Sequence, residues 1–243
     1  MINMPNWCFV CATFKSNINS RIKKLKEELL NENDFSYTKL IPEPFEFLTF
    51  DDEGNLIEHN EVNEISVIKD EDITDDIKPY ICQGTERHIH GCSIKPKGYT
   101  VINWYEWRID NYGVKWDVDK NSSAFYKEYF DTEAFVNFES PWTYPKPILD
   151  LICKKYKVDC EFSAEESGCG IYDIGKIQYH EGSDEITTVL EEYENEIDYL
   201  RALGDEVIAY VCDDCDYIFK DDELSDDEEI ECPSCGCKNY KKY

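Results

Sequence analysis

The chain has 243 residues and a mass of 28.6 kDa, enough for one sizeable core plus a small module, or for two modest domains. Its 42% hydrophobic and 14% aromatic content is typical of a folded protein and excludes wholesale disorder. The 53 acidic and 25 basic side chains leave a net charge of −28, which repels nucleic-acid phosphates and anionic lipid surfaces.

The sequence carries no sign of membrane insertion or export. No apolar run approaches the roughly 20 residues that a membrane helix needs. The first residues lack a charged segment followed by an apolar stretch, so they do not resemble a signal peptide. We therefore expect a soluble, cytoplasmic protein.

The first third of the chain predicts a strand, a helix and a second strand. Residues 7–14 (WCFVCATF) are apolar or β-branched throughout, which suits a strand buried on both faces. A helix follows as far as Leu30, with an asparagine cap at position 17 or 19 and its apolar residues on one side. After a second strand over 45–50, the acidic segment 51–97 is expected to be an insertion with at most a short hairpin.

The middle of the chain continues the alternation of strands and helices. The expected elements are a helix over 99–112 ended by Gly113, a strand over 114–118, a strand over 134–138, a helix over 146–156 and a hairpin over 157–164 and 170–180. This order predicts an α+β domain over residues 1–180, with one antiparallel sheet and helices on one face.

Four short motifs occur in a fixed order: MPNWC at 4–8, LIPEP at 40–44, NYGVKWD at 111–117 and FESPW at 138–142. Together they resemble the YubB-like ferredoxin-like domain of plasmid and bacteriophage proteins, over residues 4–180 apart from the acidic insertion. The family usually has Trp where Tyr112 stands and Thr where Val114 stands. The resemblance implies a ferredoxin-like fold, a mobile-element setting and a bacterial host, and it supplies no catalytic mechanism.

Residues 181–204 are expected to form an acidic amphipathic connecting helix ended by Gly204. The spacings of four, three, four and three place one narrow apolar stripe along it, made of Ile186, Leu190, Tyr193, Ile197 and Leu200. A stripe of two to three heptads rarely holds a dimer alone, so we expect it to dock on the first domain.

The last segment, residues 205–243, predicts a zinc ribbon. Two Cys-x2-Cys pairs, sixteen residues apart, supply four thiolates at a zinc-ribbon spacing: Cys212, Cys215, Cys232 and Cys235. Four sulfurs close the tetrahedron around Zn²⁺, so the metal is expected to be structural. Cys237 is a spare thiol with poorer spacing.

The other cysteines give weaker signals. A second candidate ligand set lies within eleven residues, although its spacing matches no established pattern: Cys82, His88, His90 and Cys92. Cys8 and Cys11 are three apart in a predicted strand and so point to opposite faces. We expect buried, reduced thiols there and at three further positions, Cys153, Cys160 and Cys169.

The negative charge is unevenly distributed along the chain. Residues 51–80 hold 11 acidic and two basic side chains, and residues 181–243 hold 21 and five. Such runs usually solvate a surface, and the alternative is a surface directed at a basic partner. The candidate partner-binding residues are Asp70, Glu71, Asp72, Asp75, Asp76, Asp221, Asp222, Asp226, Asp227, Glu228 and Glu229.

No phosphate-binding loop, zinc-protease motif or nucleophile elbow occurs, so we name no catalytic residue and expect no enzyme. The leading hypothesis is a non-catalytic, acidic, zinc-containing protein of a mobile element. It would bind a basic host protein, of the nucleic-acid-binding or defence kind, as an inhibitor or nucleic-acid mimic. The alternatives are an unrecognised hydrolase and a zinc-ribbon nucleic-acid adaptor that uses the basic stripe Lys15, Arg21, Lys23, Lys24 and Lys26.

Overall fold

The structure, a computed structural model, describes residues 6–30, 35–51, 53–57, 64–82, 96–118, 129–220 and 231–243. Its strands are β1 (Trp7–Lys15), β2 (Glu46–Thr49), β3 (Glu64–Lys69), β4 (Tyr99–Val101), β5 (Tyr129–Phe130), β6 (Glu133–Pro141), β7 (Asp159–Glu166), β8 (Ile171–His180), β9 (Glu185–Glu192), β10 (Ala209–Cys212), β11 (Ile218–Lys220) and β12 (Tyr240–Lys242). Its α-helices are α1 (Asn19–Leu29), α2 (Trp104–Tyr112), α3 (Lys146–Tyr156) and α4 (Glu196–Leu203). No described helix is long and apolar enough to cross a membrane.

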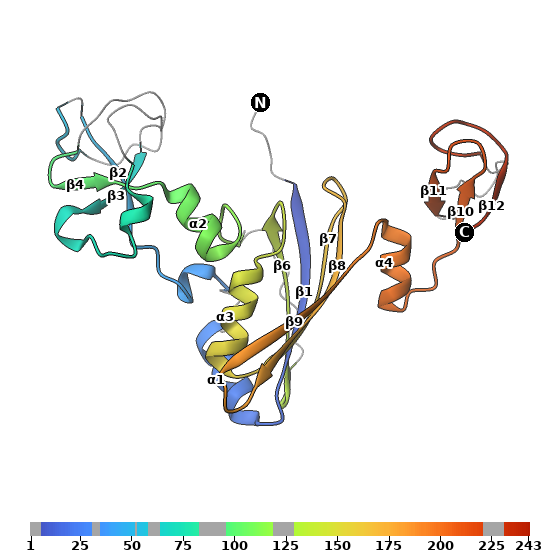
Figure 1. Ribbon diagram of the computed structural model, residues 1–243, viewed down its shortest axis with the longest axis horizontal. Helices are drawn as coiled ribbons and strands as arrows, with labels where there is room; N and C mark the ends of the chain where they lie inside the picture. The colour runs from blue at the N-terminus through green and yellow to red at the C-terminus, as the bar shows by residue number, and fades with distance from the viewer. Residues whose placement is uncertain are drawn as a thin grey trace.

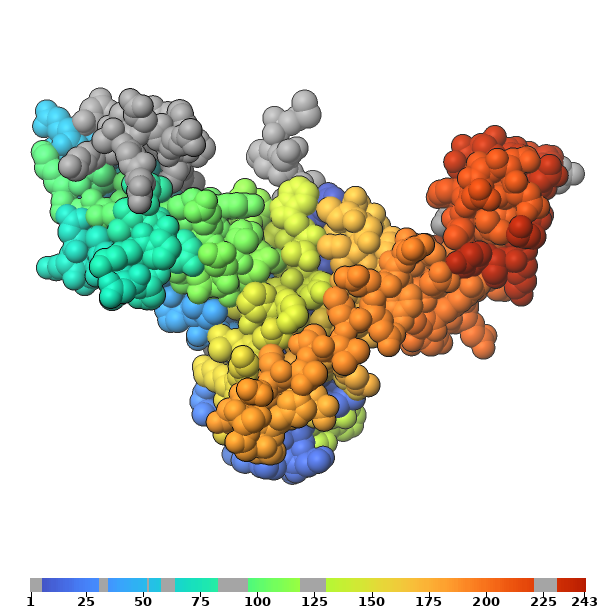
Figure 2. Space-filling view, viewed as in Figure 1, coloured from blue at the N-terminus to red at the C-terminus, as the bar shows by residue number. Residues whose placement is uncertain are grey.

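A six-stranded sheet forms the centre of the molecule, in the order β5-β6-β1-β7-β8-β9, and all of its neighbours are antiparallel. Strands β6 and β7 lie on either side of β1 and are joined by α3, which is a split β-α-β unit. Two small three-stranded sheets, β2-β3-β4 and β11-β10-β12, lie at opposite ends of the molecule (Figures 1 and 2). The α+β class is confirmed, although the single sheet predicted for residues 1–180 is accompanied by a second one, β2-β3-β4.

Strand β1 is buried on one face only, contrary to the prediction for residues 7–14. Cys8, Val10, Ala12 and Phe14 are inaccessible beneath the helices, whereas Phe9 on the other face is 46% exposed. The run appeared uniformly apolar because its open face also carries an aromatic ring and a thiol. The sheet therefore has a covered face, packed on α1 and α3, and an open face.

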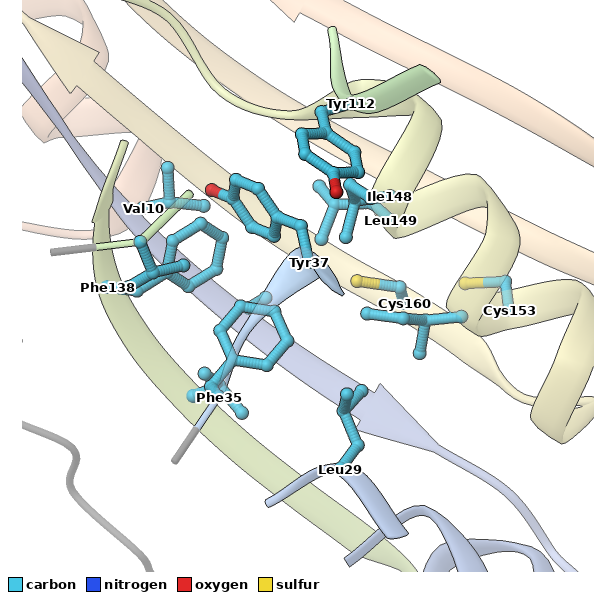
Figure 3. Packing of buried hydrophobic residues seen from close by; sticks show 14 of the residues in the cluster. Val10, Leu29, Phe35, Tyr37, Tyr112, Phe138, Ile148, Leu149, Cys153 and Cys160 are labelled. Atoms are coloured by element: carbon cyan, nitrogen blue, oxygen red, sulfur yellow. The ribbon is translucent and has the colours of Figure 1, made fainter. Parts of the chain in front are cut away.

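The core lies between the sheet and the two helices. Phe35 and Phe138 pack with ring centroids 5.1 Å apart, and Tyr37 packs on Tyr112 at 5.6 Å (Figure 3). Helix α3 has the predicted bounds and buries five side chains here, Ile148, Leu149, Ile152, Cys153 and Tyr156. Large rings contribute most of the apolar area that such a core removes from water.

The acidic segment 51–97 contains more structure than the predicted hairpin. Its residues 64–69 form β3, the central strand of the small sheet, paired with β2 on one side and β4 on the other. The apolar run 65–68 (ISVI) is inside this sheet, and Val67 is only 1% exposed. A short apolar run in an acidic segment becomes a strand because two neighbouring strands supply its hydrogen bonds.

The predicted helix over 181–204 is wrong in its first half. Residues 185–192 form β9, which pairs with β8, and only residues 196–203 form a helix, α4. Ile186 and Leu190 pack on the core with the two-residue period of a strand. The β-branched run 186–189 favours that strand, and Gly182 and Asp184 adopt the positive φ angles of the tight turn before it. The sheet domain therefore continues past residue 180.

Two further boundaries differ around α2. The helix begins after Asn103, whose side chain accepts a hydrogen bond from Glu106 N, and residues 99–101 belong to β4. Residues 114–118, predicted as a strand, form none. Gly113 turns the chain at a φ of 81°, and a Cβ there would lie 2.6 Å from Pro147 Cδ. The Asp117 carboxylate accepts from Tyr37 N and Val118 N, so side-chain bonds replace a strand ladder here.

We expect Asp173→Asn to stabilise the protein at pH 7. Asp173 lies directly opposite Glu192 across β8 and β9, and burial followed by the charge of Glu192 raises the pKa of the Asp173 carboxyl. The pKa of Asp173 is higher in the folded state than in the unfolded state. The free energy of unfolding therefore falls as the pH rises from the unfolded-state pKa, about 3.9, through the folded-state pKa. Relief of a directly opposed like-charge pair is worth roughly 0.5 kcal/mol.

Urea unfolding at pH 5 and pH 7 checks this expectation. The gain from Asp173→Asn should be larger at pH 7, and Glu192→Gln should give a similar gain because it removes the other half of the pair. A variant that is less stable than the parent at pH 7 would contradict the assignment.

Candidate metal centre

Four cysteine sulfurs converge at the C-terminal sheet, as the sequence predicted. Cys212, Cys215, Cys232 and Cys235 place their Sγ atoms within 4.8 Å of one another. Cys212 and Cys235 are 3.6 Å apart, as are Cys215 and Cys232. A tetrahedral zinc site with Zn–S bonds of about 2.3 Å separates its sulfurs by roughly 3.8 Å. The four sulfurs therefore fit such an ion with little adjustment.

The two Cys-x2-Cys turns are near copies of each other. In the first, Asp216 N donates to Cys212 O at 3.0 Å, and Cys212 N donates to Tyr217 O at 2.9 Å. In the second turn, Gly236 N donates to Cys232 O and Cys232 N donates to Cys237 O, each at 2.8 Å. The residue after each second cysteine has a positive φ, 57° at Asp216 and 72° at Gly236. This shared geometry directs two sulfurs from each turn toward one point.

Burial and charge around the sulfurs favour a bound cation. Burial opposes ionisation of the Cys212 thiol, but hydrogen bonds from the Cys237 thiol and Asp214 N outweigh it and lower its pKa to about 6. At Cys215 the Tyr217 amide favours the thiolate, but the neighbouring sulfurs outweigh it and raise the pKa to about 12. Four crowded thiols do not all ionise alone, and a divalent cation compensates their combined charge.

The ribbon has little apolar core of its own. Among its described residues, the buried cluster comprises Cys212, Phe219 and Cys232, with Tyr210 and Tyr240 packed against it. Two of these three buried residues are metal-ligand candidates. Because so small a core buries little area, a metal would supply much of the folding free energy. A site with four protein sulfurs has no open position for substrate, which suits a structural role.

Cys237, the spare thiol of the sequence, lies beside the cluster. Its Sγ is 3.1 Å from Cys212 Sγ, shorter than the sulfur spacing within a tetrahedral site. The two sulfurs are therefore in hydrogen-bond contact and are not positioned as two ligands of one ion. No sequence pattern indicated this contact, because it depends on the turn at Gly236.

The other cysteine predictions have mixed outcomes. Cys8 and Cys11 point to opposite faces, as predicted for residues three apart in a strand, but only Cys8 is buried, and Cys11 is half-buried on the open face. Cys153 and Cys160 are buried, but Cys169 is exposed in the turn after β7, which corrects its prediction.

The second candidate metal set stays untested. Cys82 is half-buried beside Ile81, which pairs with Ile102, and burial raises the pKa of its thiol. The other three members, His88, His90 and Cys92, lie outside the described residues.

Five of the predicted partner-binding residues lie in the part of the chain that the structure describes. Five exposed carboxylates follow β3 within seven residues: Asp70, Glu71, Asp72, Asp75 and Asp76. Lys78 pairs with Asp75 at 2.6 Å, and Thr100 donates to Asp70. The second acidic group lies outside the described residues, namely Asp221, Asp222, Asp226, Asp227, Glu228 and Glu229.

The predicted basic stripe, at the end of β1 and along α1, is compensated by neighbouring acidic groups. Lys15 pairs with Glu161 at 2.6 Å, and Arg21 pairs with Glu181. Lys23 and Lys24 have carboxylates one helical turn away, Glu27 at 3.7 Å and Glu28 at 3.8 Å, and Lys26 donates to Phe130 O. These contacts lower the positive field that a phosphate backbone would require.

Comparison of the sequence with known protein families gives one match. Residues 115–213 match the family model of the ferredoxin-like domain in Api92-like protein. This stretch runs from the bend after α2 to the first cysteine turn, and it includes α3, α4 and strands β5 to β10. No curated protein and no solved structure matches the chain. The match supports the ferredoxin-like part of the resemblance. It supports neither the YubB-like family name nor an origin in a plasmid or bacteriophage.

Proposed function

We propose that this chain is a non-catalytic, acidic, zinc-containing binding protein that docks on a basic protein partner. The YubB-like resemblance adds the setting: a plasmid or bacteriophage protein that meets its partner in the cytoplasm of a bacterial host. Blocking the phosphate-binding surface of that partner, as an inhibitor or nucleic-acid mimic, is the role that negative charge suits best.

The charge of the C-terminal part of the molecule carries this proposal. Residues 181–220 and 231–243 hold 14 acidic and five basic side chains. Four of the five bases pair within the same part: Arg201 with Asp198, Lys220 with Glu196, Lys238 with Glu231 and Lys241 with Asp213. Glu181 and Asp184 also pair with bases outside this part, Arg21 and Lys157. The carboxylates still outnumber the bases that pair with them, so this part keeps a net negative charge toward an external partner.

Zinc is the metal we assign to the ribbon. Thiolates are soft ligands, and a tetrahedral set of four sulfurs is typical of structural zinc in proteins that carry no iron–sulfur chemistry. Elemental analysis of the purified chain should return about one zinc per molecule.

We expect binding to the partner to weaken steeply with salt. Exposed charge pairs are screened within about 10 Å at 0.1 M salt, so affinity should fall about tenfold or more between 50 mM and 500 mM. The immobilised full chain is incubated with nuclease-treated bacterial lysate and eluted with a salt gradient, and mass spectrometry identifies the proteins. The retained proteins should be basic.

A matched pair of variants tests whether position matters as well as total charge. Asp205→Asn with Glu206→Gln removes two exposed charges from the C-terminal part, and Glu27→Gln with Glu106→Gln removes two exposed charges elsewhere. The first pair should lower the salt needed for elution more than the second. Equal effects, or partners that stay bound at 500 mM salt, would contradict the proposal, as would selective retention of added DNA or RNA.

A further inference from the structure

The open face of the six-stranded sheet carries apolar side chains that nothing in the described chain covers. Helix α4 lies on this face only at one end, where the Tyr199 ring packs on Tyr172 at 5.7 Å. Beyond it, Val189 on the edge strand is 58% exposed and Leu203 at the end of α4 is 46% exposed. Clustered apolar exposure of this kind marks a contact surface more often than a solvated one.

These residues line a groove of about 410 Å³ between α4 and the strands. Its lining comes from five strands and the helix, and its apolar members are Cys11, Phe135, Phe162, Ile174, Val189 and Leu203. The register explains the lining, because Thr13 lies between Phe135 and Glu161, and Lys176 lies opposite Val189. A volume of this size accommodates one or two side chains of a partner.

The charge around the groove is strongly negative. Strand alternation places seven carboxylates on this face: Glu133, Glu139, Asp159, Glu161, Glu165, Glu185 and Glu191. It places two lysines there, and both pair with Glu161, Lys15 at 2.6 Å and Lys176 at 2.8 Å. The face therefore keeps a net negative charge after its internal ion pairs are formed.

We propose that this groove is where a basic polypeptide segment docks, with an apolar side chain in the groove and lysines or arginines on the surrounding carboxylates. The inference rests on the proposed function and adds the place of contact and the chemistry of the segment. The apolar lining favours a segment that brings an apolar side chain as well as positive charge. The net charge disfavours a phosphate backbone and also a second copy of this acidic chain.

Two synthetic peptides of equal charge test the groove on the full, metal-loaded chain. One alternates lysine with phenylalanine and leucine (KFKLKFK), and the other replaces the apolar residues with serine and glycine (KSKGKSK). Fluorescence anisotropy of labelled peptides should show the apolar peptide binding about tenfold tighter or more, because only it fills the groove.

A matched pair of exposed apolar positions locates the binding. Val189→Lys places a charge in the groove, and Ile208→Lys makes the same change at a residue that is 48% exposed and outside its lining. The first variant should reduce binding of the apolar peptide to the level of the polar one, and the second should change it less than about threefold. Circular dichroism verifies that both variants are folded.

The outcomes separate this inference from the proposed function. If both peptides bind equally, or if the two variants behave alike, the groove is not the contact, although the acidic surfaces still bind cations. If neither peptide binds at low salt, both proposals fail. Tight binding of a single-stranded oligonucleotide, or a dimer through this face that Val189→Lys dissociates in light scattering, would replace the basic segment as occupant and overturn the inference.

Discussion

Replacing Cys232 with serine should release the metal and unfold the ribbon while the six-stranded sheet stays folded. Cys232 is 2% exposed and is both a ligand candidate and one of the three residues of the ribbon's buried cluster. Structural zinc contributes about 10–16 kcal/mol to the folding of small zinc-finger peptides. No packing of three side chains supplies a comparable free energy. The bound zinc should therefore fall from about one per chain to near zero.

The sheet should stay folded because the ribbon shares no buried cluster with it. The contacts between the ribbon and α4 are polar. Lys220 pairs with Glu196 at 2.7 Å, Tyr243 donates to Asp198, and Arg201 donates to Tyr243 O. Limited proteolysis of Cys232→Ser should cut within 205–243 and leave a stable fragment that contains the sheet. Thermal unfolding of that fragment should match the parent's main transition, since the covered face contains none of the ribbon's residues.

Cys237→Ser is the matched control for this prediction, because Cys237 contacts the cluster and is not one of the four ligand candidates. It should keep about one zinc per chain and resist proteolysis like the parent. A Cys232→Ser protein that retains its zinc would remove the assignment of the four ligands. Loss of zinc from Cys237→Ser alone would transfer the ligand role from Cys235 to Cys237.

The sequence predicted correctly those features that a local pattern of residues determines by itself. The cluster of four cysteines was predictable because two Cys-x2-Cys turns with a fixed separation supply the four sulfurs by themselves. Helix α3 was predictable for a similar reason: Pro147 lies in its first turn, and its apolar residues recur at helical spacing. Both signals are contained within a few residues.

The errors occurred where tertiary pairing chooses between two local patterns. Ile186 and Leu190 are four apart, so they share a face in a helix and also in a strand, and their pairing with β8 selects the strand. Strand β3 exists because β2 and β4 flank it. The groove needs α4 to fold back over the open face, and no sequence pattern reports that contact. Residues that depend on distant neighbours were therefore the ones missed.

Asp117→Ala should destabilise the protein by about 3 to 5 kcal/mol, the largest effect we expect of a change outside the ribbon. The Asp117 carboxylate accepts from Tyr37 N at 2.7 Å, from Val118 N at 2.8 Å and from the Ser36 hydroxyl. Tyr37 is fully buried, so alanine would leave its amide without this acceptor inside the core, and Ser36, 2% exposed, would keep only its contact with the Thr38 hydroxyl. An unsatisfied buried donor costs about 1–3 kcal/mol.

This carboxylate also gives the segment 111–117 a structural role in the chain. Tyr112 packs its ring on Tyr37 and donates its hydroxyl to Ile41 O, and Gly113 permits the turn against Pro147. Asp117 accepts a hydrogen bond from Tyr37 N and so holds the backbone of Tyr37 in the same core. The residues of the motif thus join two distant segments of chain, which is a structural role and requires no ligand.

Urea unfolding of the zinc-loaded protein, followed by tryptophan fluorescence, measures the effect. Asp117→Asn keeps one acceptor oxygen for the amides and should cost about 1–2 kcal/mol, less than alanine. Asp110→Ala removes an exposed carboxylate whose partner, the Tyr80 hydroxyl, is also near the surface, and should cost less than about 1 kcal/mol. Equal midpoints for Asp117→Ala and Asp110→Ala would show that the buried bonds to Asp117 do not hold the two segments together.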